Sequence, residues 1–244
     1  MRVLDIDLDF FLADCCPLAD KGSRPCLEGH EPWAEEKVVA FLEEQCGLRE
    51  DAPIPGAVFE THDKALVYWR DRMAEGKLKA PFHVTHVDAH SDLGIGRPGP
   101  GFVLNGVLPR ILDKRPDIEN YYEICQLDEA NYLLFALAFR WISTLDNVRN
   151  PMSRPDIPRE ILVPGREDMI QLSSFAARLS EGVNGAEPMI PFNVYDDYRE
   201  FMAEKPYDFI TLAISPRYAP KQADRLIPLI ERYIKILFCL SCKE

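Results

Sequence analysis

The sequence predicts an α/β fold: a single three-layer α/β/α domain over residues 1–244, built on a mainly parallel sheet. Short apolar segments typical of buried strands alternate along the chain with longer segments of helical periodicity. The 244 residues, of which 47% are hydrophobic, suit one domain with a well-buried core. No internal repeat, low-complexity tract or linker-like composition divides the chain, so we expect one domain.

The first hundred residues are expected to alternate strand and helix. Val3–Phe11 is short and apolar with Asp at alternate positions, which predicts a buried strand that runs into a loop. Trp33–Leu48 and Asp63–Glu75 carry apolar side chains at helical spacing, so each predicts a helix. Phe82–Asp88 is the next predicted strand. Gly94–Gly101 is dense in Gly and Pro, which predicts a loop.

The middle of the chain has weaker periodicity. We expect a short helix over Leu104–Leu112 and a strand over Tyr121–Cys125. Glu129–Leu145 is a long apolar segment, which predicts a buried core helix. Residues 146–168 are rich in proline and have little periodicity, so an extended connection is predicted there.

The C-terminal part carries a strong strand pattern and a final helix. Tyr207–Ile214 is mostly apolar and short, which predicts a buried strand. Lys221–Leu237 predicts a helix that Pro228 kinks or splits. Cys239 and Cys242 form one C-x-x-C, and since no second pair stands in metal spacing we interpret them as ordinary thiols.

The charge balance excludes several classes of partner. Forty Asp and Glu against 28 Lys and Arg give a formal charge of −12. Nucleic-acid and anionic-membrane binders need clustered Lys and Arg, so we expect neither partner.

No apolar stretch reaches the roughly 18–20 residues of a membrane span, and carboxylates interrupt the apolar start that a signal peptide would need. With seven cysteines, neither dense nor even in number, a reduced cytoplasmic location is expected. The oligomeric state stays open.

Three aspartates, Asp5, Asp7 and Asp9, stand at period two where the first strand ends. That period directs their side chains to one side of the sheet. Carboxylates held so close in a half-buried place need a compensating cation. A solvent-facing edge strand is the alternative, but the residues between and around them are too apolar for it. The segment therefore indicates a functional site.

A second segment supplies Asp88, His90 and Asp92 at alternate positions after an apolar strand. Imidazole and carboxylate together suit a divalent ion such as Mn, Fe or Zn. Ligands of parallel sheets bind at the carboxyl ends of the strands, where this loop is expected. For one of His83 and His86 we expect an ordinary core or supporting role.

The chemistry-bearing segments resemble the arginase–agmatinase group of ureohydrolases, within the arginase/deacetylase superfamily. D-A-H-S-D at 88–92 is similar to the signature of that family, and T-H-D at 61–63, with His62, resembles its earlier histidine motif. D-I-D-L-D at 5–9 resembles the late Ser-x-Asp-x-Asp motif, so the family order is rearranged here. One branch of the superfamily with this rearrangement includes enzymes that convert peptide arginine to ornithine, and N-Y-L at 131–133 resembles it too. The resemblance is specific over about residues 1–95 and looser beyond.

The resemblance implies a dinuclear centre of two divalent ions, with Mn²⁺ as the expected metal. The two ions would activate a shared water against a guanidinium carbon, releasing urea and an amine. The implied substrate is a cationic guanidinium compound: free arginine, agmatine or, as we expect, an arginine side chain in a peptide. The implied ligands are Asp7 and Asp88 as bridges, His62 and Asp92 at one ion, and His90 and Asp9 at the other.

The departing amine must be protonated, and here the sequence departs from the family. Arginases carry a histidine proton shuttle after the D-A-H-x-D strand, whereas this chain has Asn105, which cannot transfer a proton. We therefore expect Asp9 or His86 to act in catalysis. Asn105 and Asn131 are expected to contact the substrate.

Three other classes compete with this interpretation. A non-catalytic protein could keep the cluster for stability or to bind a cationic peptide, and the missing shuttle histidine favours it. A haloacid-dehalogenase-like phosphatase also begins with Asp-x-Asp after a strand, but it leaves His62, His90 and Asp92 without a role. A zinc deacetylase needs a histidine dyad that the sequence lacks.

Overall fold

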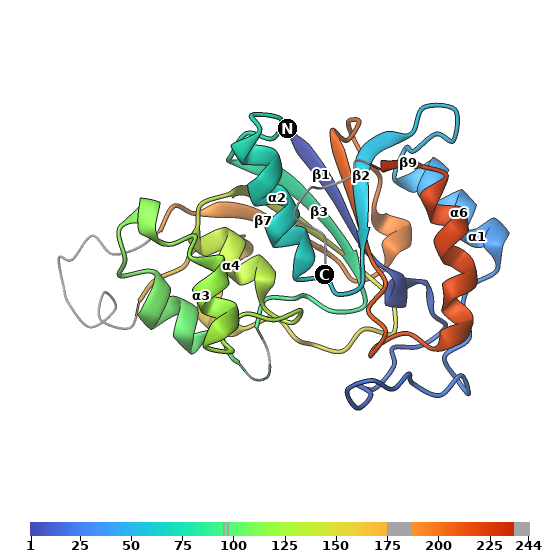
Figure 1. Ribbon diagram of the computed structural model, residues 1–244, viewed down its shortest axis with the longest axis horizontal. Coiled ribbons are helices and arrows are strands. Elements are labelled where there is room, and N and C mark those ends of the chain that lie inside the picture. Colours follow the sequence, from blue (N-terminus) through green and yellow to red (C-terminus); the bar gives the residue numbers. More distant parts are fainter. Residues whose placement is uncertain (95, 97, 175–186, 237–244) are drawn as a thin grey trace.

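The computed structural model describes residues 1–94, 96, 98–174 and 187–236. Its centre is one sheet with the strand order β5-β6-β7-β4-β3-β1-β8-β2-β9 (Figure 1). The strands from β7 to β9 in this order are parallel, whereas β6 pairs antiparallel with both β5 and β7. The strands are β1 Arg2–Asp7, β2 Ile54–Phe59, β3 Phe82–Asp88, β4 Ile142–Arg149, β5 Leu162–Val163, β6 Arg166–Ile170, β7 Ile190–Tyr195, β8 Phe209–Ala213 and β9 Ile234–Ile236.

Helices cover both faces of the sheet, and each layer buries its own apolar core. On one face lie α2 (Lys64–Ala74), α3 (Ile118–Glu123) and α4 (Tyr132–Ala138), and on the other α1 (Glu35–Ala40) and α6 (Ile227–Glu231) (Figure 1). A π-helix at Phe41–Gln45 extends α1, and another lies at Val103–Val107. The 3-10 helices are Leu8–Phe11, Leu112–Lys114, Arg159–Ile161, Tyr198–Glu200 and Lys221–Leu226. The α/β class and the mainly parallel sheet are as predicted.

The strongest sequence signals match the observed elements. Phe82–Asp88 is a strand with the predicted bounds, and the strand predicted at Tyr207–Ile214 is β8. β8 is buried along its length, and β3 is buried except at His83, because a central parallel strand is covered on both faces. The helix predicted over Asp63–Glu75 is α2, which buries Leu66 and Trp69 against the sheet.

Two predicted elements are wrong, and in both the apolar period was ambiguous. Residues 121–125 are not a strand, since α3 runs to Glu123. The helix predicted over Glu129–Leu145 ends with α4, after which Arg140 takes a positive φ of 59° and β4 begins. An unbroken apolar run fits a buried helix and a buried strand equally well, so periodicity alone could not locate the reversal.

Other predictions hold in part. The extended connection over 146–168 contains the end of β4 as well as β5 and the start of β6. The final predicted helix divides near Pro228, as expected, but into a 3-10 helix and α6, and β9 follows. Leu237, Cys239 and Cys242 lie outside the described residues.

Strand β2 was not predicted, because Pro55 and Gly56 interrupt its apolar pattern. A Cβ atom at Gly56 would lie 2.1 Å from the carbonyl oxygen of Ile210 on β8, so the close approach of the two backbones requires glycine. Gly56, which weakens the strand pattern in the sequence, is thus the residue that allows β2 to pair with β8.

Among the described residues, no helix is long and apolar enough to cross a membrane.

Candidate metal centre

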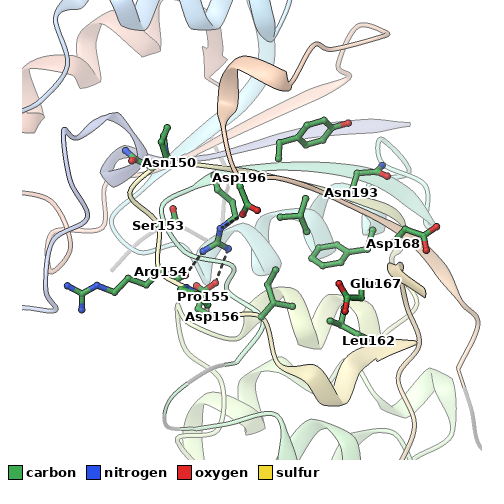
Figure 2. Close-up of a pocket in the computed structure, with 16 residues that line it drawn as sticks. Asn150, Ser153, Arg154, Pro155, Asp156, Leu162, Glu167, Asp168, Asn193 and Asp196 are labelled. Atoms are coloured by element: carbon green, nitrogen blue, oxygen red, sulfur yellow. Dashed lines mark hydrogen bonds and ion pairs between the residues drawn. The ribbon is translucent and has the colours of Figure 1, made fainter. Parts of the chain in front are cut away.

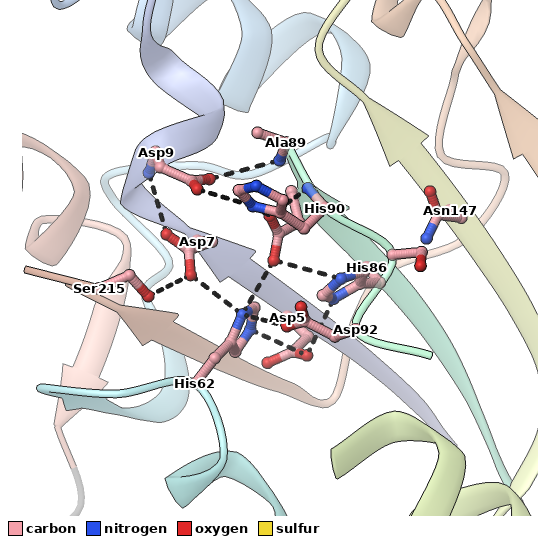
Figure 3. Close-up of polar contacts among 12 residues, drawn as sticks. Asp5, Asp7, Asp9, His62, His86, Ala89, His90, Asp92, Asn147 and Ser215 are labelled. Carbon is pink, nitrogen blue, oxygen red and sulfur yellow. Dashed lines mark hydrogen bonds and ion pairs between the residues drawn. The ribbon is translucent and has the colours of Figure 1, made fainter. Parts of the chain in front are cut away.

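The centre forms at the carboxyl ends of β1 and β3, the two middle strands that carry the chemistry-bearing segments. From β1 the chain crosses to β2 on one side of the sheet and returns to β3 on the other. Such a switch in strand order is where parallel α/β sheets bind ligands. The fold therefore brings the three segments singled out in the sequence to one place (Figure 3).

A row of buried polar side chains crosses four neighbouring strands beneath the centre. In register, Asp5 lies between His86 of β3 and Thr211 of β8, and His86 lies beside Asn147 of β4. All four residues are fully buried. Parallel strands in register point these side chains to the same face of the sheet, the face covered by α2 and α4.

Asp5 supports two histidines rather than facing the open side of the cluster. Its Oδ2 lies 3.2 Å from His62 Nε2 and 3.3 Å from His86 Nδ1. The hydroxyl of Tyr132 donates to the same oxygen, and the hydroxyl of Thr211 donates to Oδ1 at 2.5 Å. A carboxylate behind a histidine fixes the orientation of the ring, which is how metal-binding histidines are commonly held.

The opposite nitrogen of His62 faces three carboxylates at once. His62 Nδ1 lies 3.1 Å from Asp7 Oδ2, 3.0 Å from Asp88 Oδ2 and 3.2 Å from Asp92 Oδ2. The hydroxyl of Ser215 donates to Asp7 Oδ2. His62, immediately before α2, is therefore positioned by the segment that joins β2 to that helix.

His86 joins this group although we expected it in a catalytic or supporting role. His62, His86, Asp88 and Asp92 each offer a ligand atom within 4.8 Å of the others. Among the described residues, His86 Nε2 is buried without a hydrogen-bond partner, and it lies 3.3 Å from Asp88 Oδ2. An unpaired imidazole nitrogen turned toward carboxylates is a donor that a metal ion could use.

A second group shares Asp88 with the first. Asp9, Asp88 and His90 also offer ligand atoms within 4.8 Å of one another. His90 Nδ1 lies 3.0 Å from Asp9 Oδ2 and 3.6 Å from Asp88 Oδ1. Thus the two oxygens of one carboxylate face different groups. Asp7, which we expected as the other bridge, belongs to neither group, but its contact with His62 and the hydrogen bond from the Asp9 amide to its Oδ1 (3.0 Å) place it beside both.

Two of the buried carboxylates, Asp9 and Asp92, bind protons more readily than ordinary aspartates. Burial, followed by the charges of Asp7 and Asp88, raises the pKa of Asp9 well above its ordinary value. Burial and then Asp88 raise the pKa of Asp92 to about 7. Each anion is too close to the next for all of them to ionise in a low-dielectric place.

The histidines show the complementary effect. Burial alone lowers the pKa of His86, but contacts with the carboxylates of Asp5 and Asp88 outweigh it and raise that pKa to about 9. Contacts with carboxylates likewise outweigh burial and raise the pKa of His62 and of His90 well above the ordinary value. The cluster therefore demands positive charge, which protons supply here and divalent ions could supply instead. The donor set fits such ions, since imidazole and carboxylate suit Mn, Fe or Zn.

Local backbone geometry fixes the loop that carries His90 and Asp92. The amide of His90 donates to Asp88 Oδ1 at 2.7 Å, and Asp92 has a positive φ of 51°. Between them, Ser91 is tied at both ends: its amide donates to Asp156 Oδ2 at 2.7 Å and its hydroxyl donates to the Asp156 carbonyl at 2.9 Å. Such restraint holds both side chains in the cluster.

The hydrogen bonds of the two asparagines that we expected to contact the substrate are made outside the metal-ligand groups. Asn105 is exposed on its π-helix and donates to the carbonyl of Gly101 at 3.0 Å. Asn131 is buried, donates to the carbonyl of Gln126 at 3.0 Å and accepts from the amide of Asp128 at the same distance. Asn131 thus organises the turn before α4. Neither asparagine joins the two groups.

Several neighbours of the centre were not singled out as site residues. Tyr132 and Thr211 hold Asp5, but each stands inside an apolar segment where its hydroxyl gave no signal. The ring of Tyr218 packs on His90 with centroids 4.9 Å apart. Burial, followed by the charge of Asp7, raises the pKa of Glu129 to about 7. No sequence pattern marked Glu129 or Tyr218, because each reaches the centre only through the fold.

In comparisons with known proteins, no protein-family model, no curated protein and no solved structure matches the chain.

Proposed function

We propose that the protein is a dinuclear metal hydrolase that cleaves a guanidinium C–N bond and releases urea. The observation that carries the proposal is the pair of ligand groups that share Asp88 at a strand end. Two ions in such groups would lower the pKa of a shared water and hold it as a nucleophile. Manganese is the metal we expect.

The charge of the site suits a cationic substrate. Asp7, Asp9, Asp88 and Asp92 carry four negative charges when ionised, which two divalent ions balance, and a bound hydroxide leaves a small net negative charge. A guanidinium group is attracted to such a site, whereas an anionic phosphate ester is not. This difference, and the place of His62 and His90 among the carboxylates, favour guanidinium hydrolysis over a phosphatase of the haloacid-dehalogenase kind.

The chain offers a proton for the departing amine. Glu129 Oε2 is buried without a hydrogen-bond partner in the described part of the chain, and Oε1 lies 3.6 Å from Arg217 Nη1. With a pKa of about 7, Glu129 holds a proton at its carboxyl for part of the time at neutral pH. Glu129 therefore takes the proton-donor role in this proposal, in place of Asp9 and His86, which lie within the ligand groups.

The experiment is an assay of urea from the manganese-loaded protein. Free arginine, agmatine and arginine-containing peptides are tested separately, and metal content is measured on the same sample. We expect urea from at least one substrate, and a loss of about 10²–10⁴-fold in kcat in Glu129→Gln. Bound metal without urea from any substrate would instead favour a non-catalytic protein that binds metal or a cationic peptide on this cluster.

A further inference from the structure

The turn that follows β8 contacts all three segments that carry the proposed metal ligands. We call its residues, 215–219, the β8 turn. At its start the amide of Ser215 donates to the carbonyl of Glu60 at 2.9 Å, which ties the turn to the segment that carries His62. The amide of Tyr218 donates to the carbonyl of Ser215 at 2.9 Å and closes the turn. Backbone hydrogen bonds therefore place the turn relative to the centre.

Ser215 holds Asp7, a proposed ligand on β1. It takes a positive φ of 44°, a conformation that residues other than glycine rarely adopt. From there its buried hydroxyl donates to Asp7 Oδ2 (Figure 3), the oxygen that lies 3.1 Å from His62 Nδ1. An unfavourable backbone conformation that is kept at a contact with a proposed ligand indicates a functional constraint.

Tyr218 holds His90, a proposed ligand on the loop after β3. The side chain of His90 is 33% exposed, whereas those of Asp9 and Asp88 in the same group are 1% and 2% exposed. An imidazole that solvent reaches on one side can change rotamer unless a neighbour restricts it. The ring of Tyr218 packs on that imidazole with centroids 4.9 Å apart, so it keeps His90 turned toward Asp9.

Arg217, in the same turn, reaches the proposed proton donor. Its Nη1 lies 3.6 Å from Glu129 Oε1, and its Nε donates to the carbonyl of Ala19 at 3.0 Å. The β8 turn thus contacts Asp7, His90 and Glu129, which come from three different parts of the chain.

We propose that the β8 turn positions the two ligand groups relative to each other, with Ser215 orienting Asp7 and Tyr218 orienting His90. Both are positioning residues, which act on the metal ions through those ligands. The inference rests on the dinuclear centre of the proposed function, but not on the reaction that the centre performs. It adds to the centre a segment that no sequence pattern marked.

Ser215→Gly tests the first contact. It removes the hydroxyl, while glycine accepts the positive φ without strain. The loss of a residue that supports a metal ligand costs roughly 10–100-fold in affinity, and Asp7 lies beside both groups. We therefore expect weaker binding of both ions in calorimetric titration with Mn²⁺, and thermal unfolding of the metal-free variant checks its fold. Manganese affinity equal to that of wild type would overturn the role of Ser215.

A double-mutant cycle with His90 tests the second contact. Tyr218→Leu should weaken one of the two ions about two- to tenfold, and Tyr218→Phe, which keeps the ring, should bind within about twofold of wild type. In a His90→Ala background, Tyr218→Leu should have no further effect, because its action passes through His90. Equal losses in the two backgrounds, or equal losses in the Phe and Leu variants, would show that Tyr218 does not act by packing on His90.

The matched control is Tyr195→Leu, which removes a ring contact with Phe201 of 5.3 Å between centroids. Tyr195 lines a cavity of about 840 Å³ at the carboxyl ends of β4 and β7 (Figure 2), and none of the residues that line this cavity belongs to the two ligand groups. The control should keep its manganese affinity. A loss as large as that of Tyr218→Leu would mean that any lost packing loosens the centre, which contradicts the inference.

The outcomes separate this inference from the proposed function. Weaker manganese binding in the Ser215 and Tyr218 variants, without urea from any substrate in wild type, would support the inference and refute the proposed reaction. A wild-type protein that binds no manganese would overturn both.

Discussion

Replacing Asp88 with Asn should remove metal from both groups at once. Asp88 Oδ2 lies 3.0 Å from His62 Nδ1, while Oδ1 lies 3.6 Å from His90 Nδ1, so one side chain would serve both proposed sites. Even residues that only support a metal ligand cost roughly 10–100-fold in affinity when changed. A shared direct ligand should cost at least about 100-fold at each site, or about 2.8 kcal/mol.

Isothermal titration with Mn²⁺, checked by elemental analysis after dialysis, measures this loss. The matched control is Asp146→Asn, a buried carboxylate on the neighbouring strand that lies 2.6 Å from His83 Nε2 and not in either group. The control should lose stability but keep its metal. An Asp88→Asn protein that retained manganese at wild-type affinity would show that the ligand assignment is wrong.

Three further predictions concern protons and buried hydrogen bonds. Manganese must displace protons, including the one on Asp92 with its pKa of about 7, so the affinity for manganese should fall from pH 8 to pH 6. Titrations in two buffers of different ionisation enthalpy should show proton release. A manganese affinity that does not change with pH would contradict this. Tyr132→Phe removes a buried hydrogen bond to Asp5 and should destabilise the protein by about 1–3 kcal/mol in urea unfolding, whereas an unchanged midpoint would show that the bond contributes nothing. Burial raises the pKa of Glu187, but hydrogen bonds from Arg115 and Arg140 outweigh it and lower that pKa overall. The stabilising effect of ionised Glu187 is therefore present above the ordinary glutamate pKa and lost as pH falls through the lowered pKa. Glu187→Gln should reduce the loss of unfolding free energy at acid pH, and an unaltered acid dependence would refute this.

The parts of the fold that the sequence predicts are those whose apolar pattern has one interpretation. Phe82–Asp88 is short and carries Phe and Val among β-branched and aromatic residues, which favours a strand over a helix. The failure at Glu129–Leu145 has a physical cause, because α4 is apolar on every side and the apolar residues Trp141 and Ile142 follow it closely into β4. The turn between α4 and β4 depends on a left-handed backbone conformation at Arg140. Arginine seldom adopts this conformation, so the sequence does not predict the turn.

The candidate centre was more predictable than the fold around it. Asp7 and Asp9, like Asp88, His90 and Asp92, stand at alternate positions in short segments, so local geometry already directs them together. His62 stands alone in its segment and was proposed only from the family resemblance. Asp5 and His86 were noticed, but their contact depends on the register of β1 against β3, which one strand alone cannot reveal. Glu129 comes from a different layer of the fold and carries no local pattern at all.

The central claim is that two metal ions bind side by side at the ends of β1 and β3. Anomalous scattering from crystals of the manganese-loaded protein would test it most directly. The account predicts two manganese peaks about 3.5–4 Å apart, with the Asp88 carboxylate between them. Of these, one should lie beside His62 and Asp92 and the other beside His90 and Asp9. A single peak, or none at this cluster, would contradict the dinuclear centre and the hydrolysis proposed from it.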